Sequence, residues 1–143
     1  MPLGDPPNYS TPGTIRLALV SLLGSMTHFT LGALEYGRVG PFVGLWQMVL
    51  AGFLLVFGVL TTIRYLEALD AMRDPNPRTP MYDTPHEWWT YRVGLALHAL
   101  GVLLCLYWLL NSELPVFYGA ALLVNVAGVW LASGLRPRPG DHP

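Results

Sequence analysis

Four long stretches of mostly apolar residues follow one another along the chain, with short polar stretches between them. They cover about 15–34, 41–63, 90–110 and 115–135. An α-helix needs about 20 such residues to cross the hydrocarbon core of a bilayer, and each stretch is about that long. The pattern therefore predicts an all-α integral membrane protein, whose four transmembrane helices form one up-down bundle domain over residues 1–143.

The first two helices are expected to be joined by a short polar turn. Thr11 and Pro12 fit the start of the first helix, because threonine caps a helix and proline suits its first turn. The sequence Glu-Tyr-Gly-Arg at 35–38 is expected to form the turn. Within it, Glu35 and Arg38 are three residues apart and are expected to form an ion pair at the membrane interface.

The long connection at 64–87 begins with residues that suit a helix. Its charges alternate up to Arg73, and Asp74-Pro75 follows. Proline disfavours helix in the residue before it. We therefore expect the second helix to continue beyond the membrane surface and to end at about Arg73.

The third helix is expected to begin in the segment from Thr84 to Trp89. Thr84 fits the N-cap and Pro85 the first helical position, and Glu87 is placed to reach back to the cap amide. Trp88 and Trp89 then lie at the depth of the lipid headgroups, where amphipathic rings are favoured. Pro85, Glu87 and the two tryptophans are therefore predicted to anchor the bundle in the bilayer.

Arginine positions predict the orientation of the bundle. All eight basic residues are arginines, and seven of them lie near the termini or the long connection at 64–87. Arg38 alone lies at the other end of the helices. Basic residues concentrate on the cytoplasmic side of membrane proteins. Both termini and the long connection are therefore expected to be cytoplasmic.

The composition excludes several classes of function. Hydrophobic residues make up 52% of the chain and charged residues 12%, which is about half the charged share of soluble domains. The net charge of −1 gives no field that attracts nucleic acid. The sequence has no serine–histidine–aspartate set, phosphate-binding loop, CxxC pair or zinc-type spacing. We therefore expect no catalysis by this chain alone and no metal site.

Small and polar residues recur at helical spacing along each predicted helix. Lipid tails are as apolar as leucine, so close packing and hydrogen bonds between such residues must hold membrane helices together. Gly94, Gly101 and Gly128 are expected to lie at these interfaces, within the bundle or against a neighbouring subunit. The four stripes are Ser21, Ser25, His28 and Gly32; Gly44, Gln47, Ala51 and Gly58; Gly94, His98, Gly101 and Cys105; and Ala121, Asn125, Gly128 and Ala132.

His28 and His98 are the candidate ligands of a cofactor. Small residues flank each of them, as they do around the axial histidines of a b-type haem. However, His28 lies twelve residues beyond Arg16 and His98 only six beyond Arg92, an offset of roughly 9 Å along the bundle. We expect neutral histidines that hydrogen-bond between helices, and ligation of one haem by both is the alternative.

Gln47 and Asn125 are the other strongly polar side chains at depth in the predicted helices. Together with the two histidines they could line a polar path through a small homo-oligomeric transporter or channel. Proton relays in pumps use chains of ionisable groups, and no aspartate, glutamate or lysine is expected at that depth. Proton pumping by this chain alone is therefore not expected.

Two segments resemble those of a known family. One is Leu-Glu-Tyr at 34–36, and the other is Thr-Pro-His-Glu-Trp-Trp at 84–89. With the layout of four helices, they resemble the small fourth polypeptide of actinobacterial aa3-type cytochrome c oxidases. The resemblance implies an accessory subunit that holds no haem or copper and packs against the catalytic subunits, in the inner (plasma) membrane of a bacterium. Bound lipid is expected as well, in the grooves of the bundle.

The expected function is therefore that of a non-catalytic accessory subunit of a membrane respiratory complex, most simply a cytochrome oxidase or a supercomplex. Its partners are expected to be other membrane subunits and lipids. A b-type haem or quinone-reactive electron-transfer protein that uses His28 and His98 is the first alternative. The homo-oligomeric transporter or channel is the second.

Overall fold

The computed structural model describes residues 12–73 and 84–135, and the side chains at 13–70, 73 and 90–135. They form four α-helices: α1 (Pro12–Arg38), α2 (Pro41–Arg73), α3 (Thr84–Asn111) and α4 (Pro115–Gly134). All four are long and apolar enough to cross a membrane. Within the described ranges there is no β-strand. The predicted all-α membrane fold with four spans is confirmed.

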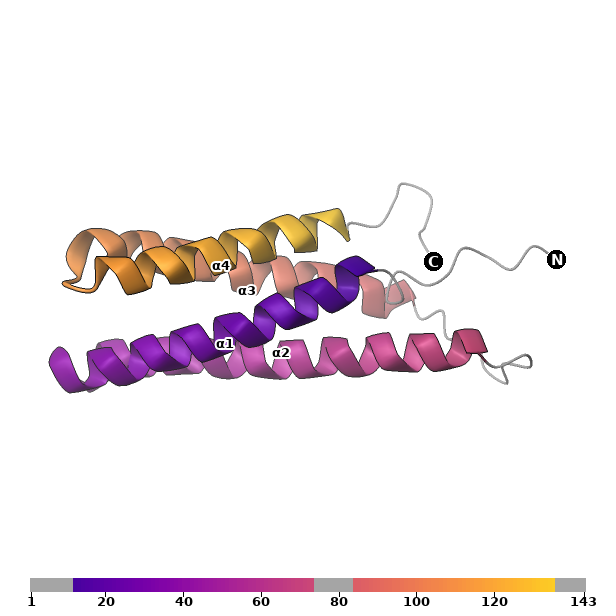
Figure 1. The fold of residues 1–143 in the computed structure, drawn as a ribbon, viewed down its shortest axis with the longest axis horizontal. Coiled ribbons are helices and arrows are strands. Elements are labelled where there is room, and N and C mark those ends of the chain that lie inside the picture. Colours follow the sequence, from indigo (N-terminus) through magenta and orange to yellow (C-terminus); the bar gives the residue numbers. More distant parts are fainter. Residues whose placement is uncertain (1–11, 74–83, 136–143) are drawn as a thin grey trace.

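The helices are arranged as two antiparallel hairpins (Figure 1). In the first hairpin α1 packs along α2, and in the second α3 packs along α4. The hairpins meet mainly through α1 and α4, whereas α2 and α3 make few contacts. We call the end of the bundle that carries the two short connections, after α1 and after α3, the turn end.

The connection between α1 and α2 is tighter than predicted, because residues 35–38 belong to helix α1. The backbone carbonyl of Glu35 accepts hydrogen bonds from the amides of Val39 and Gly40, which closes the helix. Gly40 has a φ of +124°, a conformation that glycine adopts at no steric cost. The predicted polar turn is wrong, since the reversal needs only residues 39–40.

Helix α2 ends at Arg73, as the proline after Asp74 predicted. Its 33 residues make it about 50 Å long, longer than the ~30 Å hydrocarbon core. Helix α3 begins at Thr84, one residue before the predicted first helical position. The anchoring roles of Pro85, Glu87, Trp88 and Trp89 fall on side chains outside the described residues, so they remain predictions.

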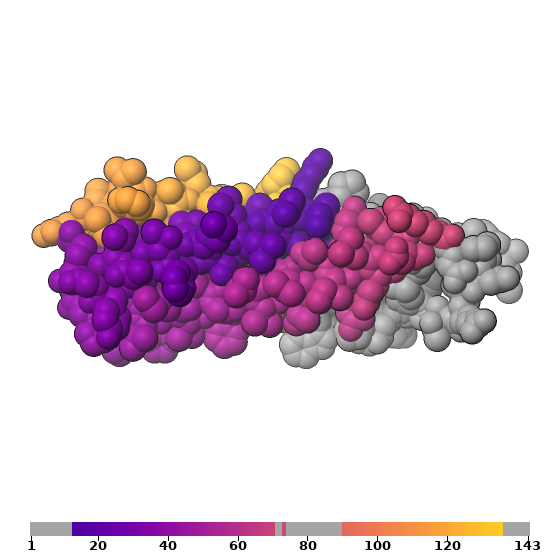
Figure 2. All heavy atoms as spheres, turned by 60° about the horizontal axis from the view of Figure 1, so that its bottom comes forward, coloured from indigo at the N-terminus to yellow at the C-terminus, as the bar shows by residue number. Residues whose placement is uncertain are grey.

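Many large apolar side chains are exposed on the outside of the bundle, although Leu17, Leu31 and Leu54 are buried. The histidines, Gln47 and Asn125 lie inside. Figure 2 shows the face on which α1 lies beside α2 along the hairpin. Outward-facing side chains suit a lipid environment, in which apolar surface has no tendency to be buried. Examples of exposed apolar residues are Leu19, Met26, Phe29, Phe53, Leu103 and Trp130.

Candidate functional site

A network of buried polar side chains joins all four helices at the centre of the bundle. It consists of Ser21 and His28 from α1, Gln47 from α2, His98 from α3 and Asn125 from α4. Each of these residues is at most 1% exposed. In a membrane a buried polar group has no water to bond to, so its partners must come from other helices.

Asn125 lies between the two imidazole rings. Its amide nitrogen, Nδ2, lies 2.8 Å from His28 Nε2 and donates over 2.8 Å to the backbone carbonyl of Ala121. Its amide oxygen, Oδ1, lies 3.2 Å from His98 Nδ1. A backbone carbonyl only accepts hydrogen bonds, so the contact with Ala121 determines which way the Asn125 amide points.

This orientation assigns the proton positions on His28. Asn125 Nδ2 donates to Nε2 of His28, so that ring nitrogen is unprotonated. The proton of the neutral ring is then on Nδ1, which donates to Gln47 Oε1 over 2.6 Å. His28 is thus held as a neutral side chain with both ring nitrogens in use.

His98 connects the second hairpin to α1. Its Nδ1–H donates to Asn125 Oδ1, and its Nε2 lies 2.9 Å from the Ser21 hydroxyl oxygen. Ser21 Oγ is also 2.8 Å from the carbonyl of Leu17 in its own helix. The two hairpins are therefore joined at two points, His98 to Ser21 and Asn125 to His28.

Three glycines of α3 and α4 make room for packing within the bundle. A Cβ atom on Gly101 would collide with the Asn125 amide, and one on Gly128 would collide with the His98 ring. A Cβ on Gly94 would lie 2.8 Å from Phe57 of α2. These glycines, predicted to lie at interfaces, thus face other helices of this chain and not an outer surface.

The arrangement does not fit a haem shared by the two histidines. Both ring nitrogens of His28 and of His98 have hydrogen-bond partners, and the Asn125 amide fills the space between the rings. The contacts agree with the predicted offset of roughly 9 Å along the bundle, because His98 bonds to Ser21, which lies seven residues, or about 10 Å, before His28 on α1. The Asn125 amide bridges the two levels by bonding to both rings.

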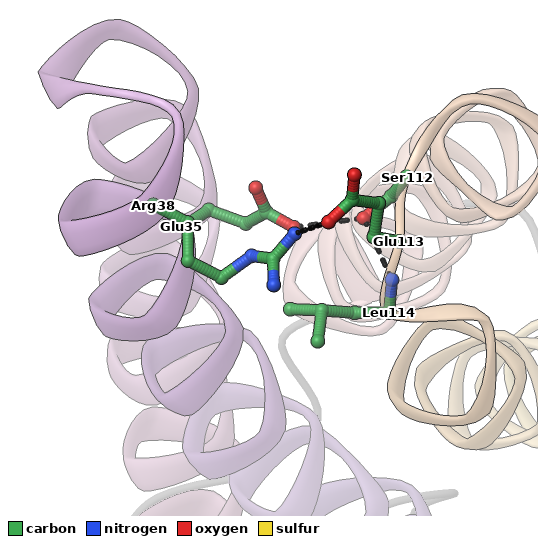
Figure 3. Close-up of polar contacts among 5 residues, drawn as sticks. All are labelled: Glu35, Arg38, Ser112, Glu113 and Leu114. Carbon is green, nitrogen blue, oxygen red and sulfur yellow. Dashed lines mark hydrogen bonds and ion pairs between the residues drawn. The ribbon is translucent and has the colours of Figure 1, made fainter.

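A second polar cluster ties the hairpins together at the turn end (Figure 3). Ser112, between α3 and α4, donates from its hydroxyl to Glu35 Oε1 over 2.9 Å and accepts from the Leu114 amide over 3.1 Å. Arg38 Nη2 lies 2.7 Å from Glu113 Oε2. The predicted ion pair of Glu35 with Arg38 is therefore wrong. Glu35 faces the bundle interior, and Arg38 reaches across to the other hairpin.

The ion pair between Arg38 and Glu113 is expected to add little stability. The two side chains are 38% and 86% exposed, and ion pairs open to solvent contribute about 0.5 kcal/mol. A double-mutant cycle with Arg38→Gln and Glu113→Gln should give a coupling energy of that size, measured by denaturant unfolding in detergent micelles. The coupling should fall further at high salt. A coupling above about 2 kcal/mol would mean that the pair is shielded from water.

A cavity of about 450 Å³ lies beside this cluster. Glu35 is one of its lining residues, although it is only 1% exposed. The hydroxyl of Tyr118, from α4, is a neighbour of Glu35 and of Gln47. It is the one buried side-chain polar atom in the described part of the chain without a hydrogen-bond partner. The cavity is lined by Glu35, Arg38, Val39, Trp108, Asn111, Ser112 and Glu113.

The sequence analysis missed Glu35 and Tyr118 as buried residues. A signal for Glu35 was present, because Thr14, Ser21, His28 and Glu35 follow one another at intervals of seven residues. Residues seven apart lie on nearly the same face of a helix, and all four are at most 1% exposed. One polar stripe thus runs from the first turn of α1 to its last.

Possible metal ligands and similarity to known proteins were two further sources of information on the site. No group of three or more histidine, cysteine, aspartate or glutamate side chains that could hold a metal ion occurs among the described residues. No protein-family model, curated protein or solved structure matches the chain.

Proposed function

We propose that the protein is a non-catalytic accessory subunit that stabilises a larger membrane complex, most simply a respiratory oxidase. The observation that carries the proposal is the central network. Polar residues inside a membrane usually mark a cofactor site or a path for ions. Here Asn125, Gln47 and both histidines bond to one another across the four helices, so their polar groups serve to hold the bundle together.

The chemistry of the network also supports a structural role over proton transfer. Carboxamide side chains stand on both sides of His28, from Gln47 and from Asn125. A carboxamide donates and accepts hydrogen bonds but does not titrate, so it does not pass a proton on as a carboxylate or an imidazole does. A path through His28 is therefore interrupted at both ring nitrogens.

The outer surface offers places where further helices could pack. Gly52 on α2 and Gly119 on α4 have open space where a Cβ atom would lie, and both are exposed or partly exposed. Small residues let the backbones of membrane helices approach closely. The resemblance of 34–36 and 84–89 to an oxidase subunit supports a respiratory partner.

Co-purification tests the proposal. The tagged chain, isolated in mild detergent from its native membranes, should bring other membrane subunits with it, including oxidase subunits with haem a absorption. Gly52→Leu should reduce their recovery severalfold while leaving the bundle folded, because the larger side chain blocks close approach of a helix.

Two results would contradict it. A stable monomer without cofactor would rule out a subunit that depends on partners. A Soret band from the purified chain alone, lost in His98→Ala, would favour the haem protein instead.

A further inference from the structure

The cavity at the turn end lies where a lipid headgroup would meet the bundle. Its lining residues come from the last turns of α1 and α3 and from the two short connections that follow them. The apolar spans end there, and the ends of such spans lie at the level of the headgroups. Two apolar side chains, those of Val39 and Trp108, are among the lining residues, and Val39 is 59% exposed.

The carboxylate of Glu35 is buried without an opposite charge beside it in the described part of the chain. Its residue is 1% exposed, and its side chain accepts a hydrogen bond from Ser112. Among the described residues no cationic side chain lies within ion-pair distance of it, because Arg38 pairs with Glu113. A buried charge needs an opposite charge or several hydrogen bonds to offset the loss of water.

Tyr118 gives a second indication. Its residue is fully buried, and its hydroxyl interacts with Glu35 and Gln47 but makes no hydrogen bond of good geometry with the described residues. Buried hydroxyls almost always have a partner. A group that brings several N–H donors to Glu35 would neutralise the carboxylate and improve the polar surroundings of the hydroxyl.

We propose that this cavity binds the headgroup of a phospholipid that carries a primary ammonium group, such as phosphatidylethanolamine. The ammonium lies against Glu35, and the phosphate lies near the guanidinium of Arg38, which is in the same cavity wall. A bound headgroup satisfies the buried carboxylate only if it donates N–H hydrogen bonds to it. The trimethylammonium group of phosphatidylcholine has none, so the site discriminates between the two lipids. The acyl chains run along exposed apolar side chains on the outside of the bundle.

This site does not depend on the proposed partner complex, and the isolated chain is sufficient to test it. The full-length protein is placed in nanodiscs or micelles, and lipid retention is followed by native mass spectrometry with phosphatidylethanolamine and phosphatidylcholine of the same acyl chains. Wild-type protein should retain phosphatidylethanolamine roughly tenfold better, as expected for one charge-assisted hydrogen bond.

Glu35→Gln should reduce this preference to about twofold or less, because glutamine keeps an acceptor for Ser112 but loses the charge. Glu67→Gln is the matched control, since Glu67 pairs with Arg64 on the surface of α2, and it should keep the full preference. Arg38→Gln should reduce the retention of both lipids by a similar factor, because both carry the phosphate.

Three outcomes would overturn the proposal. The first is equal retention of the two lipids by the wild-type protein, a result that does not depend on the folding of any variant. The second is a folded Glu35→Gln variant that keeps the full preference. The third is displacement of the lipid by soluble O-phosphoethanolamine at equal concentration, which would show a site for the free amine and not for a lipid.

Discussion

Replacing Asn125 by leucine is expected to destabilise the folded bundle by about 2 kcal/mol. The variant loses the bonds of the Asn125 amide to both histidines and to the Ala121 carbonyl. Single hydrogen bonds between membrane helices contribute about 0.6 kcal/mol on average, and the two imidazoles would each be left with one unpartnered nitrogen. Unfolding by a denaturing detergent, followed by circular dichroism, measures the loss.

Thr27→Val is the matched control for this experiment. Its hydroxyl bonds only to the carbonyl of Leu23 in its own helix, on the exposed side of α1. The change should cost at most a few tenths of a kcal/mol, since the carbonyl keeps its helical partner. If Asn125→Leu were no more destabilising than Thr27→Val, the network would not be what joins the two hairpins.

The fold could be predicted from the sequence because its signals are local. Runs of about 20 apolar residues predict spans at any position in a membrane protein, and Asp74-Pro75 predicts the end of α2 from two residues. The wrong prediction at 35–38 shows the limit of local reasoning. Polar residues there suggested a turn, but Glu35 is polar because it faces Ser112 of the other hairpin.

The candidate site could be predicted only in part. The stripe that contains Ser21 and His28 indicated an interior face, and both residues are buried. The contact of His28 with Asn125 could not be found in this way, because Asn125 lies 97 residues further along the chain. Which buried groups meet depends on the tilt and register of one hairpin against the other, and helical spacing carries no information on either.

The relative depth of the two histidines, in contrast, could be predicted from the arginines. Counting residues from Arg16 and from Arg92 assumes that the two arginines lie at one level. The bond between His98 and Ser21 agrees with this assumption, because Ser21 lies five residues beyond Arg16 and His98 six beyond Arg92. His28 then lies about 10 Å further along α1 than Ser21, and the Asn125 amide spans the difference between the two rings.

Replacing Gly44 by leucine is expected to have the largest effect of the substitutions considered, about 3 kcal/mol of lost stability or failure of the first hairpin to close. A Cβ at Gly44 would lie 2.6 Å from the carbonyl oxygen of Gly32 and 2.8 Å from the Cα of Tyr36. Both are backbone atoms of α1, so the clash cannot be relieved by a side-chain rotation, and the helices must separate.

Gly52→Leu is the control, because it makes the same change on the same helix. Gly52 has nothing within 4 Å of its Cβ position, so the leucine should point outward at little cost to the isolated bundle. Detergent-induced unfolding should therefore separate the two variants clearly. Equal stability would show that α1 and α2 do not approach closely at Gly32 and Gly44. If only Gly44→Leu unfolds easily, close backbone contact holds the first hairpin together, as expected where lipid removes the hydrophobic drive for helices to associate.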